Sequence, residues 1–485
     1  METEHNQNQD PPSEEQQVPG NPESQGASKS KKKKNRKKKG GVSNETTAAT
    51  EGSVAAPAPP VRGAGHVEPP AAPAIAQEDI MKMIKRLEVA QKKQEAAGPK
   101  EHKFWNTQPV LQEELKEEEY GPIEVQTVDD IRKEPYNMPA GFEWCSVDVT
   151  NDAEIQEVYT LLTENYVEDD DNMFRFDYSV PFLRWALTPP GFNPDLHIGV
   201  RASKSGKLMG FITGIPQRMQ VYADAVQMVE INFLCVHKKL RAKRLAPVLI
   251  KEVTRRTNLT GVFQAVYTAG VVLPKPVAEC RYWHRSLNPK KLIDVGFSRL
   301  RPKTTLQRTI KDYRLPAAPG VPGFRAMEPG DVPQVQALLA NYLARHTRVY
   351  PLLDEAEVGH WLLPTPGVVS SYVVEDPGSP GTLTDVCSFY HLPSSIIGNP
   401  EHRTLFAGYS FYNVAGSLEW IDLMRALLIK ARDEGMDVFN ALDLMQNQTF
   451  LQDLKFGIGD GHLQYYLYNW KCPKVEPQGI GLVLL

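Results

Sequence analysis

A mostly apolar run, a basic stretch and a second apolar run follow one another near the middle of the chain. The first run, Met228–Val236, contains β-branched residues and predicts a buried strand. The second, Leu245–Glu252, is apolar at helical spacing, and Pro247 is tolerated in the first turn of a helix. The basic residues between the two runs are His237, Lys238, Lys239, Arg241, Lys243 and Arg244. Free backbone N–H groups and the positive end of a helix dipole meet at such a turn, which favours a phosphate site over a basic surface loop.

The pattern of the globular part recurs at a spacing of 176 to 178 residues. Five pairs of similar segments occur in the same order, which makes coincidence improbable. The pairs are Leu161–Tyr166 with Leu338–Tyr342, Trp185–Gly191 with Trp361–Gly367, Ile215–Pro216 with Leu392–Pro393, Phe233–Val236 with Phe411–Val414, and Val262–Val266 with Val438–Leu442. The chain is therefore predicted to contain two similar halves.

Each half is predicted to run helix, strand, strand, strand, helix, strand, which is a mixed α/β (α+β) arrangement. Ser203–Lys207 and Pro377–Gly381 form matching turns between strands, and the Pro- and Gly-rich segment Pro316–Gly323 marks the junction. The sequence predicts three divisions: a tail (1–78), a first half (79–315) and a second half (316–485).

The first hundred residues differ in composition from the rest. Residues 1–78 have almost no large apolar side chains, so we expect them to be disordered. Within them, residues 29–39 hold nine cations and no acid, which is typical either of a solubilising tail or of a tether to ribosomal RNA or an anionic membrane. Residues 77–94 show apolar positions on one helical face and predict a short helix.

Charge and cysteine content point to a cytoplasmic protein. Residues 1–100 have 16 basic and 13 acidic side chains, whereas residues 101–485 have 39 basic and 46 acidic ones. The second part therefore has a net charge of −7, which suits cationic partners better than DNA. The sequence has no apolar run long enough for a transmembrane helix and no signal-peptide pattern. The five cysteines are widely spaced and odd in number, which argues against a disulfide framework and a zinc site; they are Cys145, Cys235, Cys280, Cys387 and Cys472.

Motifs of several other enzyme classes are missing from the sequence. It contains no Gly-x-Ser-x-Gly, no Walker-type Gly-Lys-Ser/Thr and no His-Glu-x-x-His. The glycines of Gly457–Gly461 resemble a nucleotide loop only superficially, because no strand-to-helix pattern surrounds them. A loop for a second substrate is the better interpretation.

Two longer strings carry a family resemblance. Glu230-Ile-Asn-Phe-Leu-Cys-Val-His-Lys238 resembles the first signature of N-myristoyltransferases, and Lys455-Phe-Gly-Ile-Gly-Asp-Gly461 resembles the second. Arg241-x-x-Arg244-x-Ala246 is similar to the pyrophosphate loop of GNAT-type acyltransferases. The resemblance extends from about Phe104 to Leu485 and is closest to animal members.

The resemblance implies two GNAT-like halves around one saddle-shaped sheet. It also implies transfer of a myristoyl group from myristoyl-CoA, a co-substrate, to the N-terminal glycine of nascent proteins, with no prosthetic group and no metal. The backbone N–H groups of Phe233 and Leu234 would form the oxyanion hole, which requires a bulge in the strand. CoA and myristoyl binding would fall on Lys103, Phe104, Trp105, Phe233, Leu234, Cys235, Val236, Ala242, Arg244, Leu245 and Ala246.

The family's peptide site corresponds mainly to aromatic and hydroxyl residues of this chain. By the resemblance it comprises Tyr166, Asn232, Thr268, Tyr282, His284, Tyr390, Ser394, Tyr409, Asp460 and Leu463. Without the resemblance, ordinary half-buried packing would explain most of them. The acids of Glu168–Asp171 would form an anionic rim suited to peptides that carry Lys or Arg.

The chain finishes with Ile480-Gly-Leu-Val-Leu-Leu485, and an apolar end is expected to fold into the core. The resemblance implies that the C-terminal carboxylate, here that of Leu485, is the base for the glycine amine. A hydrophobic plug without chemistry is the alternative.

Two other functions stay open on sequence grounds. One is an acetyltransferase-like enzyme that uses a shorter acyl-CoA, and the other is a ribosome or RNA adaptor that binds through residues 29–39. Under the favoured function we expect a cytoplasmic enzyme, partly associated with ribosomes or peripherally with membranes.

Overall fold

The computed structural model describes residues 102–115, 118–167 and 173–485, all within one compact unit. The expected tail 1–78, its basic run 29–39, the helix 77–94 and the acidic rim 168–171 lie outside the described residues. Within the described ranges, no helix has the length and apolar character needed to cross a membrane.

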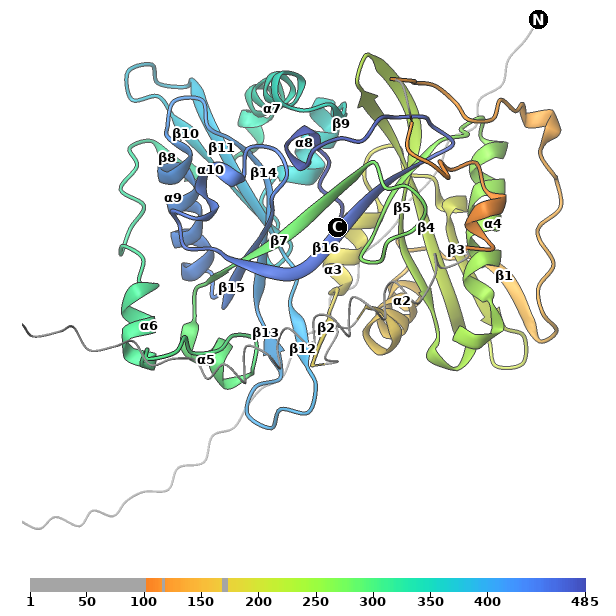
Figure 1. Cartoon of the computed structure of the whole chain (residues 1–485), viewed down its shortest axis with the longest axis horizontal. Coiled ribbons are helices and arrows are strands. Elements are labelled where there is room, and N and C mark those ends of the chain that lie inside the picture. Colours follow the sequence, from red (N-terminus) through yellow and green to blue (C-terminus); the bar gives the residue numbers. More distant parts are fainter. Residues whose placement is uncertain (1–101, 116–117, 168–172) are drawn as a thin grey trace, which may run out of the picture. The chain divides into compact units, whose positions relative to one another are not determined.

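The two halves contribute matching sets of strands to one large mixed sheet (Figure 1). The first half supplies β1 (Phe142–Ser146), β3 (His197–Ala202), β4 (Leu208–Val221), β5 (Asp224–Val236) and β6 (Ala265–Ala269). The second supplies β8 (Phe324–Ala326), β10 (Val369–Glu375), β11 (Leu383–His391), β14 (Ala407–Val414) and β15 (Val438–Leu442). In each set the neighbours are antiparallel up to the last pair, β5–β6 or β14–β15, which is parallel. The predicted repeat and the mixed α/β class are confirmed.

The centre of the sheet is built by an exchange of strands between the halves. β7 (Ala278–Ser286) follows β6 in the chain but pairs with β15 of the second half. β16 (Gly457–Tyr468) ends the second half but pairs with β6 of the first. The sheet order is therefore β6-β16-β7-β15, and Figure 1 shows β7 and β16 crossing the middle of the molecule. Each half thus completes the hydrogen-bonding edge of the other.

Three helices of the first half also have counterparts in the second. They are α2 (Asp152–Asn165), α3 (Val180–Leu187) and α4 (Leu245–Leu259), matched by α7 (Val332–His346), α8 (Glu355–Leu362) and α9 (Trp420–Asp433). The predicted element order omitted α3 and α8, and it also omitted β1 and β8, which precede the first helix of each half. Five of the eight residues of α3 are buried, and a helix of about two turns offers too few positions to establish a helical period in the sequence.

The remaining elements are short. β2 (Phe174–Phe176), β12 (Ser394–Ile396) and β13 (Thr404–Leu405) form a separate small sheet, and β9 (Val349–Pro351) pairs with β4. The other helices are α5 (Pro289–Asp294), α6 (Leu306–Asp312) and α10 (Gln448–Leu451), with 3₁₀ turns η1 (Trp105–Thr107), η2 (Val128–Asp130), η3 (Pro194–Leu196), η4 (Lys238–Lys243), η5 (Pro329–Asp331) and η6 (Pro477–Gly479). The predicted junction falls between α6 and β8, where the chain is irregular.

Two equivalent tryptophans meet where the halves join. Trp185 of α3 and Trp361 of α8 pack edge to face, with ring centroids 5.0 Å apart. The indole N–H of Trp185 donates to the carbonyl oxygen of His360 at 2.9 Å, and Nε2 of His360 lies 2.7 Å from the carbonyl oxygen of Trp185. Because Trp185 and Trp361 are counterparts in the repeat and contact each other, they lie close to the approximate twofold axis that relates the halves.

The turns before α4 and α9 have opposite electrostatic character. Before α9, the buried carboxylate of Asp385 accepts hydrogen bonds from the backbone N–H groups of Gly416, Ser417 and Leu418 at 2.9–3.1 Å. Its other oxygen accepts from the Ser417 hydroxyl at 2.6 Å. Met209 is the counterpart of Asp385, because each precedes the strand residue paired with the last residue of β5 or β14. An internal anion thus occupies the turn in the second half, whereas the first half has six basic residues there.

We predict that Asp385→Ala lowers the free energy of unfolding by about 2–5 kcal/mol, because it leaves several buried N–H groups without an acceptor. Chemical denaturation monitored by tryptophan fluorescence measures this. Asp422→Ala, which removes an exposed acid from the first turn of the same helix, is the matched control and should change stability by less than about 1 kcal/mol. Equal stability of the two variants would contradict the role given to Asp385.

Candidate active site

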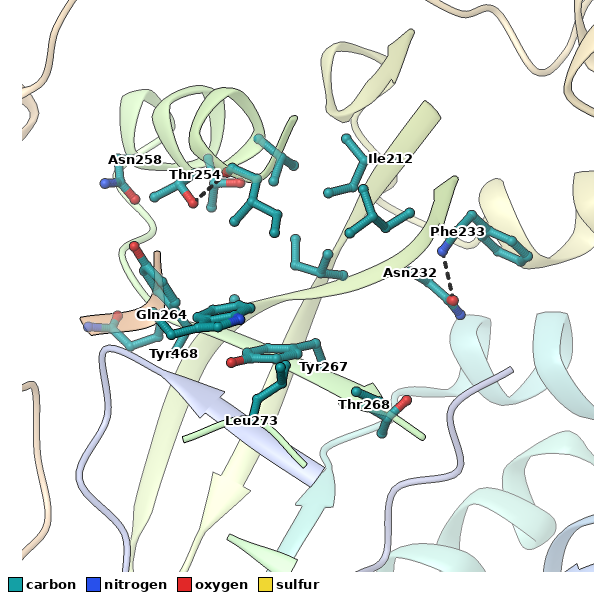
Figure 2. Close-up of a pocket in the computed structure, with 18 of the residues that line it drawn as sticks. Ile212, Asn232, Phe233, Thr254, Asn258, Gln264, Tyr267, Thr268, Leu273 and Tyr468 are labelled. Carbon is teal, nitrogen blue, oxygen red and sulfur yellow. Dashed lines mark hydrogen bonds between the residues drawn. The ribbon is translucent and has the colours of Figure 1, made fainter. Parts of the chain in front are cut away.

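β5 contains a bulge at Phe233 and Leu234, where the predicted oxyanion hole requires one. Phe211 of β4 pairs with Cys235 and Thr213 pairs with Asn232, so that two residues of β5 face one of β4. Phe233, one of the extra pair, has a φ of +52° that is rare for a non-glycine residue. Its N–H group donates to Oδ1 of Asn232 at 2.8 Å (Figure 2). The bulge therefore turns a backbone donor away from the regular strand pairing.

The amide group of Asn232 joins this bulge to the end of the chain. Its Oδ1 accepts from Phe233 N, and its Nδ2 donates to the backbone oxygen of Leu485 at 2.8 Å. The Asn232 side chain uses its acceptor for one bond and its donor for the other, and it thereby fixes the distance between the bulged amide and the terminal residue. Sequence reasoning assigned Asn232 to the peptide site, and the structure places it between the two predicted catalytic elements.

The last six residues are packed into the core, as their apolar sequence predicted. Ile480, Leu482 and Leu484 are all buried. The N–H group of Gly481 donates to Val349 at 2.8 Å. A Cβ at Gly481 would lie 2.8 Å from three neighbouring side chains, so only glycine fits there. The burial holds the backbone of Leu485 beside Asn232.

A first cavity, of about 180 Å³, lies between α4 and the sheet (Figure 2). Most of its lining is apolar or aromatic. Of the predicted residues it contains Trp105, Tyr166, Asn232, Phe233, Leu234 and Thr268. Trp105 stacks on Tyr267 with ring centroids 5.5 Å apart, and Tyr267 stacks in turn on Tyr466 at 4.9 Å. A segment near residue 105 thus covers a cavity built from elements more than a hundred residues away.

Sequence reasoning missed several residues of this lining. They are Ile212, Ile231, Ile250, Val253, Thr254, Thr257, Asn258, Phe263, Gln264, Ala265, Tyr267, Ala269, Leu273 and Tyr468. Apolar residues on strands and on the inner face of a helix have the same pattern whether they fill a core or line a cavity. No signal in the sequence distinguishes the two cases.

The cationic turn lies between the end of β5 and the start of α4, which begins at Leu245 as predicted. Arg244 is exposed and has a φ of +57°, after a 3₁₀ turn that supplies right-handed residues. A right-handed residue followed by a left-handed one points successive N–H groups into one concavity, a known anion-binding arrangement. The first turn of α4 carries no acid. The geometry therefore suits a phosphate.

The sequence predicted that Arg241 binds an anion, but in the structure its side chain binds the protein backbone. Its guanidinium donates to the backbone oxygen of Asn165 at 2.7 Å, at the end of α2. The side chain of Asn165 accepts from the N–H group of Lys238 at 2.9 Å. These bonds fix the shape of the turn. Of the other predicted CoA residues, Lys103 and Ala242 are exposed, Phe104, Val236 and Ala246 are half-buried, and Cys235 and Leu245 are buried.

A second cavity, of about 290 Å³, lies at the exchange region and the small sheet. Of the predicted peptide residues it contains Tyr282, His284, Ser394 and Tyr409. Burial lowers the pKa of His284, so its ring is neutral near pH 7. Nδ1 of this ring lies 2.7 Å from Oδ1 of Asn440, an acceptor, so the proton is assigned to Nδ1. Asn440 belongs to the repeated segment Val438–Leu442, and no feature of the sequence marks it as a site residue.

The glycines of Gly457–Gly461 belong to strand β16, so the prediction that they form a loop is wrong. A Cβ at Gly459 would lie 2.3 Å from Nε2 of His284, so the ring of His284 requires glycine there. The backbone oxygen of Gly459 accepts from Nε of Arg281 at 2.9 Å. Asp460 is exposed and Leu463 half-buried on the same strand.

A row of aromatic rings connects the two cavities. Phe233 packs on Tyr178 at 5.2 Å, Tyr178 on Phe176 at 5.8 Å, and Phe176 on Tyr409 at 6.4 Å. Tyr390 stacks behind Tyr409 at 5.2 Å and is buried, so it supports the second cavity without lining it. The predicted residues that line the two cavities thus belong to one continuous region that extends from α4 to the small sheet.

Two family models match this chain. "Myristoyl-CoA:protein N-myristoyltransferase, N-terminal domain" matches residues 122–280, and the corresponding C-terminal domain matches residues 294–483. Among curated proteins, glycylpeptide N-tetradecanoyltransferase 2 of Danio rerio is 55% identical over 423 residues, 86% of this chain and 85% of that protein. Glycylpeptide N-tetradecanoyltransferase 1 of Arabidopsis thaliana is 57% identical over 394 residues, 80% of this chain and 90% of that protein.

Solved structures agree with these matches. The crystal structure of Saccharomyces cerevisiae N-myristoyltransferase with bound myristoyl-CoA is 41% identical, with a TM-score of 0.76, and covers 80% of this chain and 100% of its own. The family models, the relatives and the fold agree over most of the described residues. The chain therefore belongs to the N-myristoyltransferase family and is an acyltransferase.

Proposed function

We propose that the chain transfers a myristoyl group from myristoyl-CoA to the N-terminal glycine amine of protein substrates. The observation that carries this proposal is the pair of hydrogen bonds by which Asn232 links the bulged amide of Phe233 to Leu485. It brings a donor for a developing oxyanion and a carboxylate close together beside an apolar cavity. The names of the relatives and the ligand in the yeast structure support the same reaction.

The first cavity is the proposed site of the acyl chain. Its lining suits an alkyl chain, because burial of each CH₂ group stabilises the complex by about 0.8 kcal/mol. The cationic turn before α4 is the proposed phosphate site, and Trp105 is the proposed cover of the cavity. The equivalent turn before α9 is occupied by the carboxylate of Asp385, which restricts acyl-CoA binding to the first half.

The bulge of β5 is the proposed oxyanion site. When the amine attacks, the thioester oxygen gains negative charge, and the N–H groups of Phe233 and Leu234 would stabilise it. In the structure the N–H group of Phe233 donates to Asn232, so this donor is not left unpaired before the substrate arrives. The developing oxyanion is a stronger acceptor than a side-chain amide and would replace it.

The carboxylate of Leu485 is the proposed base. A terminal amine has a pKa of about 7.7–8.0, so it is mainly protonated at neutral pH and cannot attack. The carboxylate takes one proton from the ammonium group, and the nitrogen then attacks the carbonyl carbon. The C–S bond breaks, and the CoA thiolate accepts the second proton of the nitrogen. Asn232 holds the carboxylate in place throughout.

The second cavity is the proposed site of the residues that follow the glycine. Its lining combines aromatic walls with the polar groups of His284, Ser394 and Asn440, which suits an extended peptide. The acids of Glu168–Asp171 are proposed to attract lysine or arginine in that peptide. The proposed partner of residues 29–39 is the ribosome, or an anionic membrane surface, of a cytoplasmic enzyme that acts on nascent chains.

The product of the reaction tests this proposal. Purified protein is incubated with myristoyl-CoA and a peptide that begins with glycine, and mass spectrometry locates the added acyl group. We expect one myristoyl group on the α-amine. A peptide with alanine in place of the glycine, and acetyl-CoA in place of myristoyl-CoA, are the controls. Preferred use of acetyl-CoA would favour the acetyltransferase alternative, and no transfer at all would favour the adaptor.

We predict that Arg244→Glu weakens binding of myristoyl-CoA by about 10- to 150-fold, since hydrogen bonds to charged groups contribute about 1.5–3 kcal/mol. Calorimetric titration of the folded variant with myristoyl-CoA measures this. Lys311→Glu makes the same charge change at the exposed end of α6, which lines neither cavity, and should leave the affinity unchanged. Wild-type affinity in Arg244→Glu would remove the phosphate assignment.

A further inference from the structure

Glu230 lies on β5 two residues before Asn232, so both side chains leave the same face of the strand. Asn232 binds one oxygen of Leu485, and Glu230 lines a small cavity together with Leu485. The cavity has room of about 20 Å³, enough for one water molecule. A second acid is thus built into the wall beside the proposed base, on the strand that carries the oxyanion site.

The carboxyl group of Glu230 has no hydrogen bond or ion pair within the part of the chain that the structure describes. Burial alone raises its pKa to about 8. The group is therefore mainly an uncharged carboxylic acid at pH 7 and carries an O–H donor. The residue is half-buried, and a carboxyl group shielded from bulk solvent without a protein partner costs free energy, so packing alone does not account for an acid here.

The surroundings of this carboxyl group contain other acids but, in the described residues, no basic side chain lines the cavity. Gln217 comes from β4 and Tyr412 from β14, and the hydroxyl of Tyr412 accepts from the N–H group of Val483 at 3.4 Å. Burial raises the pKa of Tyr412 and of Glu357 on α8. The negative charges of Glu230 and Glu357 raise the pKa of Tyr412 further. Among the described residues that line the cavity, the side chains able to donate to the Leu485 carboxylate are therefore uncharged.

We propose that Glu230 is a positioning residue for the base: as an uncharged acid it donates a hydrogen bond, through one water molecule, to the carboxylate of Leu485. This inference rests on the proposed function. An apolar environment favours the protonated form of a carboxylate, and a protonated Leu485 has no basicity to offer. Two donors, Asn232 on one oxygen and Glu230 on the other, keep the carboxylate charged and oriented towards the amine.

The role of Glu230 has a characteristic pH dependence. Below its pKa of about 8 the donor is present, and above it the group becomes a second anion beside the first. The donated hydrogen bond is then lost and the two carboxylates repel each other. Positioning by Glu230 is therefore complete at pH 7 and declines through pH 8 to 9, while the substrate amine becomes easier to deprotonate.

Two variants of similar size separate this role from packing. In Glu230→Gln the amide donates at every pH, and in Glu230→Met no donor is left. We expect Glu230→Gln to keep the wild-type kcat at pH 7, and the ratio of wild-type to Glu230→Gln kcat to fall to about one tenth at pH 9. We expect Glu230→Met to lower kcat about tenfold at pH 7 with an unchanged KM for myristoyl-CoA. The ratio cancels the titration of the amine.

The measurement is kcat and KM for the wild type and both variants at pH 7 and pH 9, with myristoyl-CoA and a peptide that begins with glycine. Thermal melting and myristoyl-CoA binding establish that each variant is folded. A Met variant with the wild-type kcat at both pH values would overturn the inference, because packing would then explain Glu230. A Gln variant as slow as the Met variant would also overturn it, because the charged acid would be required. Absence of transfer by the wild type would instead overturn the proposed function.

Discussion

The two hydrogen bonds of Asn232 connect the parts of this structure that the proposed reaction needs. One bond satisfies the bulged amide of Phe233, and the other fixes the last residue of the chain. Neither end is independent: the bulge requires a strained φ at Phe233, and the position of Leu485 requires that the preceding residues be buried. A short polar side chain therefore couples a local distortion of one strand to the packing of a segment about 250 residues away.

The divergence of the two halves supports the proposal of a single acyl-CoA site in the first half. The two halves share their sheet topology, their three helices and even the contact between equivalent tryptophans. They differ at the turn after the fifth equivalent strand, where the first half presents exposed cations and the second half supplies Asp385 as an internal anion. The exchange of β7 and β16 then places the second cavity at the boundary of both halves, joined to the first by aromatic rings.

Much of this arrangement could be predicted from the sequence where one local pattern determines one local structure. The strand–turn–helix around Met228–Ile250, the repeat and the burial of the apolar C-terminus are such cases. The exchange of β7 and β16 could not be predicted, because strand pairing between halves leaves no mark on either strand. The engagement of Arg241 with Asn165 and the role of Tyr267 as a cavity wall depend equally on contacts distant in sequence. Glu230 stands within the recognised signature, yet only the cavity beside Leu485 distinguishes it from an ordinary strand residue.

The central claim is that the terminal carboxylate of Leu485, held by Asn232, removes the proton from the substrate amine. A synthetic peptide for residues 472–485 can be ligated at Cys472 with either a carboxylate or an amide at its end, which changes the charge and keeps the apolar packing. The measurement is kcat of the two ligated proteins, with myristoyl-CoA binding as the test of an intact fold. A general base contributes about 10²–10⁴-fold, so the amide should turn over at least about a hundredfold more slowly than the carboxylate. Equal turnover of the two proteins would contradict the account.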